Sequence, residues 1–130
     1  MVKAEIITIG DEILYGQILD TNTQWISLEL DKLGIKTVRK SSVGDQKSEI
    51  LQSLNEAAQR ADVVFITGGL GPTKDDLTKK ILAEYFDCEL AMHPVALQDV
   101  TEFFAKRGRE LSDINRDQAL LPTKAEFVRN

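Results

Sequence analysis

Short apolar runs alternate with amphipathic stretches along this chain, and this alternation restricts its fold more than any other feature. Residues 4–9 predict a strand that ends at Gly10, and residues 35–39 predict a second, less apolar strand nearer a sheet edge. Residues 63–66 predict a third strand, buried on both faces and therefore central. With helices between them, these strands predict an α/β fold: a mostly parallel sheet with helices on both faces.

Three helices are expected to follow these three strands. The first begins with a capping box at Thr21, carries Trp25 in the core and ends at Gly34. Asp45 is expected to cap the second helix, and the third is expected to begin near Asp75. This order of elements is typical of parallel strands joined by crossover connections.

The second half of the chain has a less regular pattern. A short strand is predicted at residues 88–91, followed by a helix that starts at Pro94 and ends near Gly108. Residues 112–120 predict another short helix, and residues 126–128 a last strand. With no repeat, low-complexity tract or linker, we expect residues 1–130 to form one domain.

Composition and charge exclude several classes of function. The chain is 42% hydrophobic and carries a net charge of −5, with no basic cluster of the kind that neutralises phosphates, so nucleic acid is not the expected ligand. Its longest apolar run is only Val63–Ile66, and its first residues do not form a secretory signal, so no membrane association is expected. The single cysteine, Cys88, cannot form an internal disulfide. These features predict a cytoplasmic protein.

The loop after the first predicted strand contains two adjacent carboxylates. Asp11 and Glu12 follow Gly10 directly, and Asp20 and Asn22 lie where the next helix begins. The simplest interpretation is a turn with solvated acids and a capped helix. The alternative is a polar site at the carboxyl end of a strand, where open parallel sheets place their ligands.

A glycine-rich loop follows the third predicted strand. Gly68, Gly69 and Gly71 allow backbone amides to approach an anion without interference from side chains. Asp75 and Asp76 then place two hard oxygen ligands beside that anion, which suits a divalent cation bridging carboxylate and phosphate oxygens. The alternative is a glycine-rich turn followed by an N-cap.

Two common nucleotide motifs do not match this loop. Pro72 follows Gly71 where a Walker A loop requires lysine and a hydroxyl residue, and Lys74 stands where a dinucleotide fingerprint requires glycine. Both loops leave the carboxyl ends of predicted strands. If those strands are neighbours, the carboxylates converge, and the two loops together favour a binding site more than either does alone.

Several motifs resemble the amino-terminal domain of the CinA (competence/damage-inducible) family, across almost the whole chain. The matching stretches are residues 4–14 with Gly16, 20–22, 43–45, 67–78 and 115–119 followed by Pro122. This resemblance implies a three-layer α/β/α fold similar to the molybdopterin-binding proteins MoaB and MogA. It also implies a homo-oligomer, a dimer or a trimer, because such proteins commonly form them.

The resemblance also implies an activity. In MoaB and MogA proteins the matching glycine loop, with an acidic residue at the position of Asp76, serves a pterin phosphate site. In CinA proteins the implied activity is metal-dependent hydrolysis of ADP-ribose at its pyrophosphate. The family pattern continues past Asn130 with a Gly-Thr-Ala-Pro-Gly stretch that completes the pocket, so the domain is expected to be truncated at its carboxyl end.

The predicted function is therefore a divalent-metal-dependent ADP-ribose pyrophosphatase domain. Asp11, Asp75 and Asp76 are the predicted metal ligands, for Mg²⁺ or alternatively Co²⁺ or Mn²⁺, with K⁺ as a further candidate cation. Asp76, Glu12 and Asp11 are the predicted catalytic residues, with Glu12 as the candidate general base, although a structural role for Glu12 stays open. The predicted ligand-binding residues are Gly10, Asn22, Gly68, Gly69, Leu70, Gly71, Thr73 and Thr78.

Two other functions stay open at this point. One is a module that binds a molybdopterin-like or nucleotide ligand without turnover. The other is an assembly domain for a nicotinamide mononucleotide deamidase domain, which full-length CinA proteins often add and which this chain does not contain. In the first case the partner is a pterin or nucleotide, and in the second a protein domain.

Overall fold

The computed structural model describes residues 1–71 and 77–130. These residues form two compact units, Met1–Gly69 and Leu70–Asn130. The predicted single domain over residues 1–130 stays a prediction. In the part of the chain that the structure describes, no helix is long and apolar enough to span a membrane.

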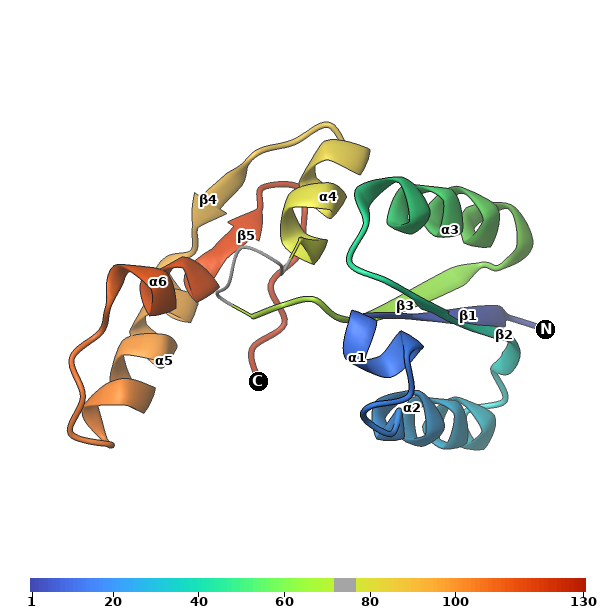
Figure 1. The fold of residues 1–130 in the computed structure, drawn as a ribbon, viewed down its shortest axis with the longest axis horizontal. Helices are drawn as coiled ribbons and strands as arrows, with labels where there is room; N and C mark the ends of the chain where they lie inside the picture. Colours follow the sequence, from blue (N-terminus) through green and yellow to red (C-terminus); the bar gives the residue numbers. More distant parts are fainter. Residues whose placement is uncertain (72–76) are drawn as a thin grey trace. The chain divides into compact units, whose positions relative to one another are not determined.

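Strand β1 (Lys3–Ile9) is the central strand of the first unit. It pairs in parallel with β2 (Lys36–Val43) on one side and with β3 (Val63–Gly68) on the other (Figure 1). Every residue of β1 after Lys3 is buried, whereas β3 is at most half-buried. The predicted central position of residues 63–66 is therefore wrong for the described sheet, and the predicted edge position of the second strand is confirmed.

Helices cover both faces of this sheet. Helix α2 (Thr21–Lys32) lies on one face and α3 (Lys47–Arg60) on the other, with the short α1 (Asp11–Leu14) at the end of β1 (Figure 1). On the α2 side, the core consists of Ala4, Ile6 and Leu30, with Ile26, Ile35 and Phe65 packed against them. The predicted three-layer α/β/α arrangement with a parallel sheet is confirmed.

A buried ion pair joins the central strand to α3. Glu5 is only 1% exposed, and its two carboxylate oxygens accept hydrogen bonds from Nη2 and Nε of Arg60 at 2.8 and 3.1 Å. A buried carboxylate is costly unless it is paired and hydrogen-bonded in this way. The pair explains how a charged residue occupies the middle of the most buried strand.

Three local predictions in the first unit are wrong. Asp20, not Thr21, caps α2, because its side chain accepts a hydrogen bond from the amide of Thr23. Asp45 does not cap α3, whose N-cap is Gln46. Trp25 is 65% exposed and is not a core residue.

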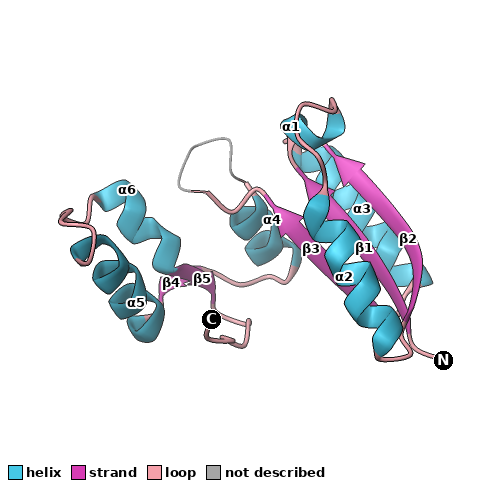
Figure 2. Ribbon diagram, turned by 90° about the horizontal axis from the view of Figure 1, so that it is seen from below, coloured by secondary structure: helices cyan, strands magenta, loops and turns pink. Residues whose placement is uncertain are grey.

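The second unit combines helices with one small antiparallel sheet (Figure 2). Pro94 is the first residue of its longest helix, as predicted, and His93 caps that helix by accepting from the amide of Ala96. Residues 126–128 form no strand. The last strand comes earlier in the chain, at Leu120–Pro122, and pairs with the short strand Leu90–Met92 before Pro94. The elements are α4 (Thr78–Tyr85), β4 (Leu90–Met92), α5 (Pro94–Ala105), α6 (Asp113–Arg116), η1 (Asp117–Ala119) and β5 (Leu120–Pro122).

Candidate functional site

The three strands of the first unit end at the same edge of the sheet, because they run parallel. Ile9 lies opposite Val43 of β2 and opposite Gly68 of β3. The first and third predicted strands are thus neighbours, which was the condition for their loops to converge. The loops after β1, β2 and β3 therefore leave the sheet side by side.

Asp11 and Asp45 hold the first two of these loops together. The amide of Asp45 donates to Oδ1 of Asp11 at 3.0 Å, and the amide of Asp11 donates to Oδ2 of Asp45 at 3.3 Å. Below them, the amide of Gly10 donates to the carbonyl of Val43 at 2.9 Å. We call the reciprocal pair of Asp11 and Asp45 the aspartate clasp.

Gly44 leaves the space in which this clasp forms. A Cβ added to Gly44 would lie 2.7 Å from Oδ1 of Asp11 and 3.3 Å from the side chain of Leu14. Glycine at this position therefore allows the Asp11 carboxylate to lie against the backbone of the second loop.

Glu12 folds back over the end of β1. A Cβ added to Gly10 would lie 2.6 Å from Oε1 of Glu12, so the carboxylate lies directly against the Gly10 backbone. Among the described residues, no hydrogen bond to the Glu12 carboxylate is formed. Its oxygens are thus able to accept a proton from a ligand.

Gly68 ends β3 in a conformation that only glycine adopts readily. Its φ is +91°, and a Cβ there would overlap the carbonyl oxygen of Ile9 in β1. Gly69, which follows, also has a positive φ of 61°. These two residues turn the backbone at the end of β3, opposite Ile9 of β1, which brings the start of the glycine-rich loop to the same edge as the aspartate clasp.

The start of α2 contributes a third group to this edge. Nδ2 of Asn22 donates to Oγ1 of Thr67, the residue before Gly68, at 3.4 Å. Asp20 fixes this helix start, since its carboxylate accepts hydrogen bonds from the buried hydroxyls of Thr8 and Thr23 at 2.8 and 2.5 Å. The helix start that positions Asn22 is therefore held by the half-buried Asp20 and by two buried threonine hydroxyls, Thr8 and Thr23.

The hydrogen bonds around Asp20 determine its ionisation. Burial alone would raise the pKa of Asp20, but hydrogen bonds from the side chain and amide of Thr23 and the hydroxyl of Thr8 outweigh it. Together with the charge of Lys40, they hold the pKa of this carboxyl below its ordinary value. Asp20 is accordingly ionised at neutral pH.

The remaining predicted site residues belong to the second unit or lie outside the described residues. Thr78 is the first residue of α4 and is buried, whereas Leu70 and Gly71 are exposed. Thr73, Asp75 and Asp76 lie outside the described residues. The structure thus brings together Gly10, Asp11, Glu12, Asn22, Gly68 and Gly69 at one edge of the first unit.

A lysine at the start of α4 holds the Asn115–Ala119 segment. Nζ of Lys79 donates to the carbonyl of Asp117 at 2.8 Å, and burial lowers the pKa of its ammonium group. Nε2 of Gln118 donates to Oδ1 of Asn115 at 3.1 Å within that segment. These polar residues, one of the stretches that match the CinA pattern, therefore have a structural role inside the second unit.

The donor set at the edge of the first unit fits part of a cation site. Oδ2 of Asp11 has no hydrogen-bond donor among the described residues, and the Asp45 carboxylate accepts from the backbone amide of the same residue. Hard carboxylate oxygens are the ligands that Mg²⁺ prefers. Within residues 1–71 and 77–130, no group of three acidic, histidine or cysteine side chains could hold a metal ion.

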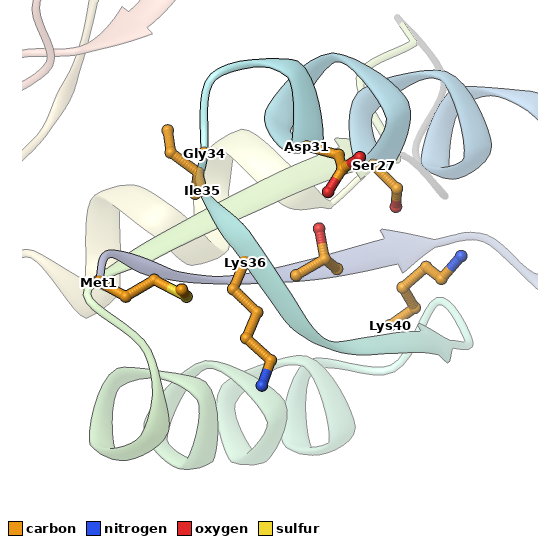
Figure 3. Close-up of a pocket in the computed structure, with 8 residues that line it drawn as sticks. Met1, Ser27, Asp31, Gly34, Ile35, Lys36 and Lys40 are labelled. Atoms are coloured by element: carbon orange, nitrogen blue, oxygen red, sulfur yellow. The ribbon is translucent and has the colours of Figure 1, made fainter.

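A hollow in the first unit lies elsewhere, toward the amino ends of β1 and β2. It measures about 580 Å³ and contains none of the predicted site residues. Figure 3 shows Ser27 and Asp31 of α2 on one side, and Lys36 and Lys40 of β2 with their amines pointing in different directions. The buried hydroxyl of Thr37, a residue that lines this hollow, has no hydrogen-bond partner among the described residues.

Sequence reasoning missed Asp45 and Thr67 as members of the site. Asp45 was expected to cap a helix, although it follows Gly44 after a strand in the same way that Asp11 follows Gly10. This repeated Gly-Asp pair after two neighbouring strands was the signal that could have found it. Thr67 lies within the glycine motif but was given no role of its own.

Comparison with known proteins places the chain in a family. The family described as "Probable molybdopterin binding domain" matches residues 5–126. A CinA-like protein of Cytophaga hutchinsonii is 58% identical over 99% of this chain, and one of Flavobacterium psychrophilum is 48% identical over 99%. The chain spans 31% of the length of each of these relatives.

Solved structures agree with this assignment. A CinA protein of unknown function from Thermoplasma acidophilum aligns with a TM-score of 0.84 at 31% identity, covering 98% of this chain and 75% of that one. The tungsten cofactor synthesizing protein MoaB of Pyrococcus furiosus aligns with a TM-score of 0.65 at 34% identity, covering 82% and 67%. Both alignments include most of this chain.

Proposed function

Because this chain belongs to the family of probable molybdopterin-binding domains, among its CinA-like members, we propose that it is a divalent-metal-dependent nucleotide pyrophosphatase domain that hydrolyses ADP-ribose. The observation that carries this proposal is the aspartate clasp of Asp11 and Asp45 beside the glycine turn at Gly68. It combines carboxylates that suit a cation with a backbone turn that suits a phosphate.

In this proposal the glycine turn binds the pyrophosphate of the substrate. Backbone amides beyond a strand end can donate to phosphate oxygens, and glycine lets the phosphate approach them closely. Among the described residues, the amide of Gly69 has no hydrogen-bond acceptor, which supports this role. Asn22, held against Thr67, adds a side-chain amide near the same strand end.

Asp11 and Asp45 would hold the divalent cation, and Asp75 and Asp76 belong to the proposed ligand set through their motif. When bound, Mg²⁺ supplies Lewis-acid polarisation of a phosphoryl oxygen. Co²⁺ or Mn²⁺ would serve the same purpose, and K⁺ is proposed as a further cation. The clasp fixes the Asp11 carboxylate before any ligand arrives, so less ordering is needed on binding.

Glu12 is the proposed general base. A water oxygen attacks one phosphorus of the pyrophosphate, the bridging P–O bond breaks, and the products are AMP and ribose 5-phosphate. The proton lost by the water passes to the Glu12 carboxylate, which has no competing hydrogen-bond donor among the described residues. Glu12 is held on α1 directly after β1, next to the clasp.

The rival function is a binding module for a pterin ligand without turnover. The description of the matching family favours it, since that description names molybdopterin binding. The same edge of the sheet would then hold a pterin phosphate instead of a nucleotide pyrophosphate. The two functions differ in turnover and in their dependence on a cation.

A product assay distinguishes the two. The chain is incubated with ADP-ribose and Mg²⁺, with and without K⁺, and with EDTA, and AMP is quantified by chromatography. We expect AMP with Mg²⁺, none with EDTA, and a loss of at least 100-fold in Asp11→Asn and Asp76→Asn. Asp62→Asn, an exposed carboxylate before β3, is the matched control and should keep full activity. Full activity in Asp76→Asn, or no AMP together with metal-independent pterin binding, would reject the proposal.

A further inference from the structure

Thr67, the next-to-last residue of β3, carries a hydroxyl group that is only half used. Its Oγ1 accepts a hydrogen bond from Nδ2 of Asn22 at 3.4 Å. In the part of the chain that the structure describes, the hydroxyl hydrogen of Thr67 has no acceptor. Because a threonine hydroxyl can accept and donate at the same time, its O–H is left to donate to another group.

The strand register places Thr67 on the α2 face of the sheet. Phe65, two residues earlier in β3, packs into the core that contains Leu30 of α2. Side chains two residues apart in a strand point to the same face, so Thr67 points the same way as Phe65. It lies opposite Thr8 of β1, is half-buried, and comes directly before the glycine turn at Gly68.

The start of α2 holds Asn22 against Thr67. Two residues before Asn22, the Asp20 carboxylate accepts hydrogen bonds from the amide of Thr23 at 3.1 Å and from the hydroxyl of Thr8 at 2.8 Å. These hydrogen bonds tie the first turn of α2 to β1, the neighbour of β3. The exposed Asn22 is thereby fixed at the end of β3, where its amide orients the Thr67 hydroxyl.

We propose that the Thr67 hydroxyl donates to a phosphate oxygen of the ligand at the glycine turn, and that Asn22 is the residue that positions it. The inference rests on the proposed function, from which it takes a pyrophosphate as the bound group. Ionised phosphate oxygens only accept hydrogen bonds, so they complement a hydroxyl that already accepts one from Asn22. The hydrogen bond that a hydroxyl accepts also strengthens the one that it donates.

The position of Thr67 along the chain suits this contact. The amide of Gly69, two residues later, has no acceptor among the described residues. The Thr67 hydroxyl and the Gly69 amide are therefore two donors within three consecutive residues, at the edge where β1 and β3 both end. Two donors of different direction match a group with several oxygens, such as a pyrophosphate, better than a ligand with a single acceptor.

Inorganic pyrophosphate with Mg²⁺ is the probe, because its binding requires no turnover, and isothermal titration calorimetry gives its dissociation constant. Thr67→Val replaces the hydroxyl with a methyl group of similar size and should raise this constant about 10- to 100-fold, because a hydrogen bond to a charged group is lost. Thr67→Ser keeps a hydroxyl and should stay within about threefold of wild type. Thr37→Val, opposite Ala4 toward the amino end of β2, is the matched control and should leave binding unchanged.

A double-mutant cycle tests the positioning role of Asn22. Asn22→Ala, at an exposed position, should raise the dissociation constant of pyrophosphate about three- to tenfold. In the Thr67→Val background the same change should have no further effect, because Asn22 acts through the hydroxyl that is missing. Circular dichroism checks that each variant folds. Asn22→Ala does not alter the sheet, so it tests the contact even if Thr67→Val fails to fold.

Three results would overturn the inference. One is a wild-type chain that does not bind pyrophosphate, and another is a Thr67→Val variant that binds it as tightly as wild type. The third is an effect of Asn22→Ala that persists in the Thr67→Val background, since Asn22 would then act without Thr67. Failure of the proposed function gives a different result: pyrophosphate binding depends on Thr67 as predicted, but ADP-ribose yields no AMP.

Discussion

Asp11 and Asp45 exchange two hydrogen bonds, each donating its backbone amide to the carboxylate of the other, at 3.3 and 3.0 Å. The two residues are 34 positions apart and follow two neighbouring strands. Because each carboxylate is oriented by a backbone amide, it does not have to be ordered by a ligand. This arrangement gives the proposed site a fixed pair of acidic groups.

The first prediction concerns the space beneath the clasp. Gly44→Ala would place a Cβ 2.7 Å from Oδ1 of Asp11, so the carboxylate must move. We expect the rate of ADP-ribose hydrolysis to fall about 10- to 100-fold, because small displacements of catalytic groups have effects of this size. Stability should change by less than about 1 kcal/mol, because the atom that moves is at the end of a side chain.

Steady-state kinetics and urea unfolding of the purified variant check this prediction. Gly34→Ala is the control, since a Cβ there meets nothing within 4 Å. It should lose about 1 kcal/mol of stability through its positive φ while keeping its activity. An unchanged kcat/KM in Gly44→Ala would show that the clasp does not matter for turnover.

The second prediction concerns the end of β3. Gly68 has a φ of +91°, which alanine adopts only with strain, and the Cβ introduced by Gly68→Ala would overlap the carbonyl oxygen of Ile9. We expect a loss of about 3 kcal/mol or more in the free energy of unfolding, because the clash is with backbone and cannot be relieved by a side chain. Thermal unfolding of wild type and variant measures this loss of stability. A cost no larger than that of Gly16→Ala, where φ is +75° and the space is open, would contradict this geometry.

The third prediction concerns the pH dependence of stability. The folded pKa of Asp20 is lowered relative to its ordinary value of 3.8, so its carboxylate stabilises the protein above pH 3.8. This stabilisation is lost as the pH falls through the folded pKa. Asp20→Asn keeps a good helix cap but removes the charge, and we expect it to cost about 1 kcal/mol at pH 7, since water screens a partly buried group.

Urea unfolding of wild type and Asp20→Asn at pH 7 and pH 3 checks the direction of the pKa shift of Asp20. The difference in unfolding free energy between them should shrink at pH 3, where the wild-type carboxylate begins to take up its proton. Asp31→Asn, which changes an exposed carboxylate on the same helix, is the control. A difference that grows in acid would mean that the pKa of Asp20 is raised in the folded protein.

The order of elements in the first unit was predictable, but the order of strands in the sheet was not. Residues 63–66 are the most apolar run, yet β1 is the central strand. Its Glu5 and Thr8 are tolerated there because Arg60 and Asp20 satisfy their hydrogen bonds. Partners that come from distant parts of the chain are not visible in a local pattern.

The position of Trp25 was not predictable for a different reason. Helix α2 has apolar residues on both of its faces, and periodicity alone does not show which face meets the sheet. The register with Thr23 and Leu30 inward places Trp25 outward.

The candidate site was predictable only in part. The convergence of the loops after β1 and β3 followed from the parallel order of the strands. The role of Asp45 depended on hydrogen bonds between two loops, which a local sequence pattern does not show.

The most direct test of the account is to map where ADP-ribose binds. Amide chemical shifts of the ¹⁵N-labelled chain are followed during titration with ADP-ribose and Mg²⁺, in the wild type and in Asp11→Asn. The account predicts that the amides of Asp11, Asp45, Gly68 and Gly69 shift most, and that Asp11→Asn weakens binding at least tenfold. Shifts confined to the hollow lined by Ser27 and Lys40, or no shifts at all, would contradict it.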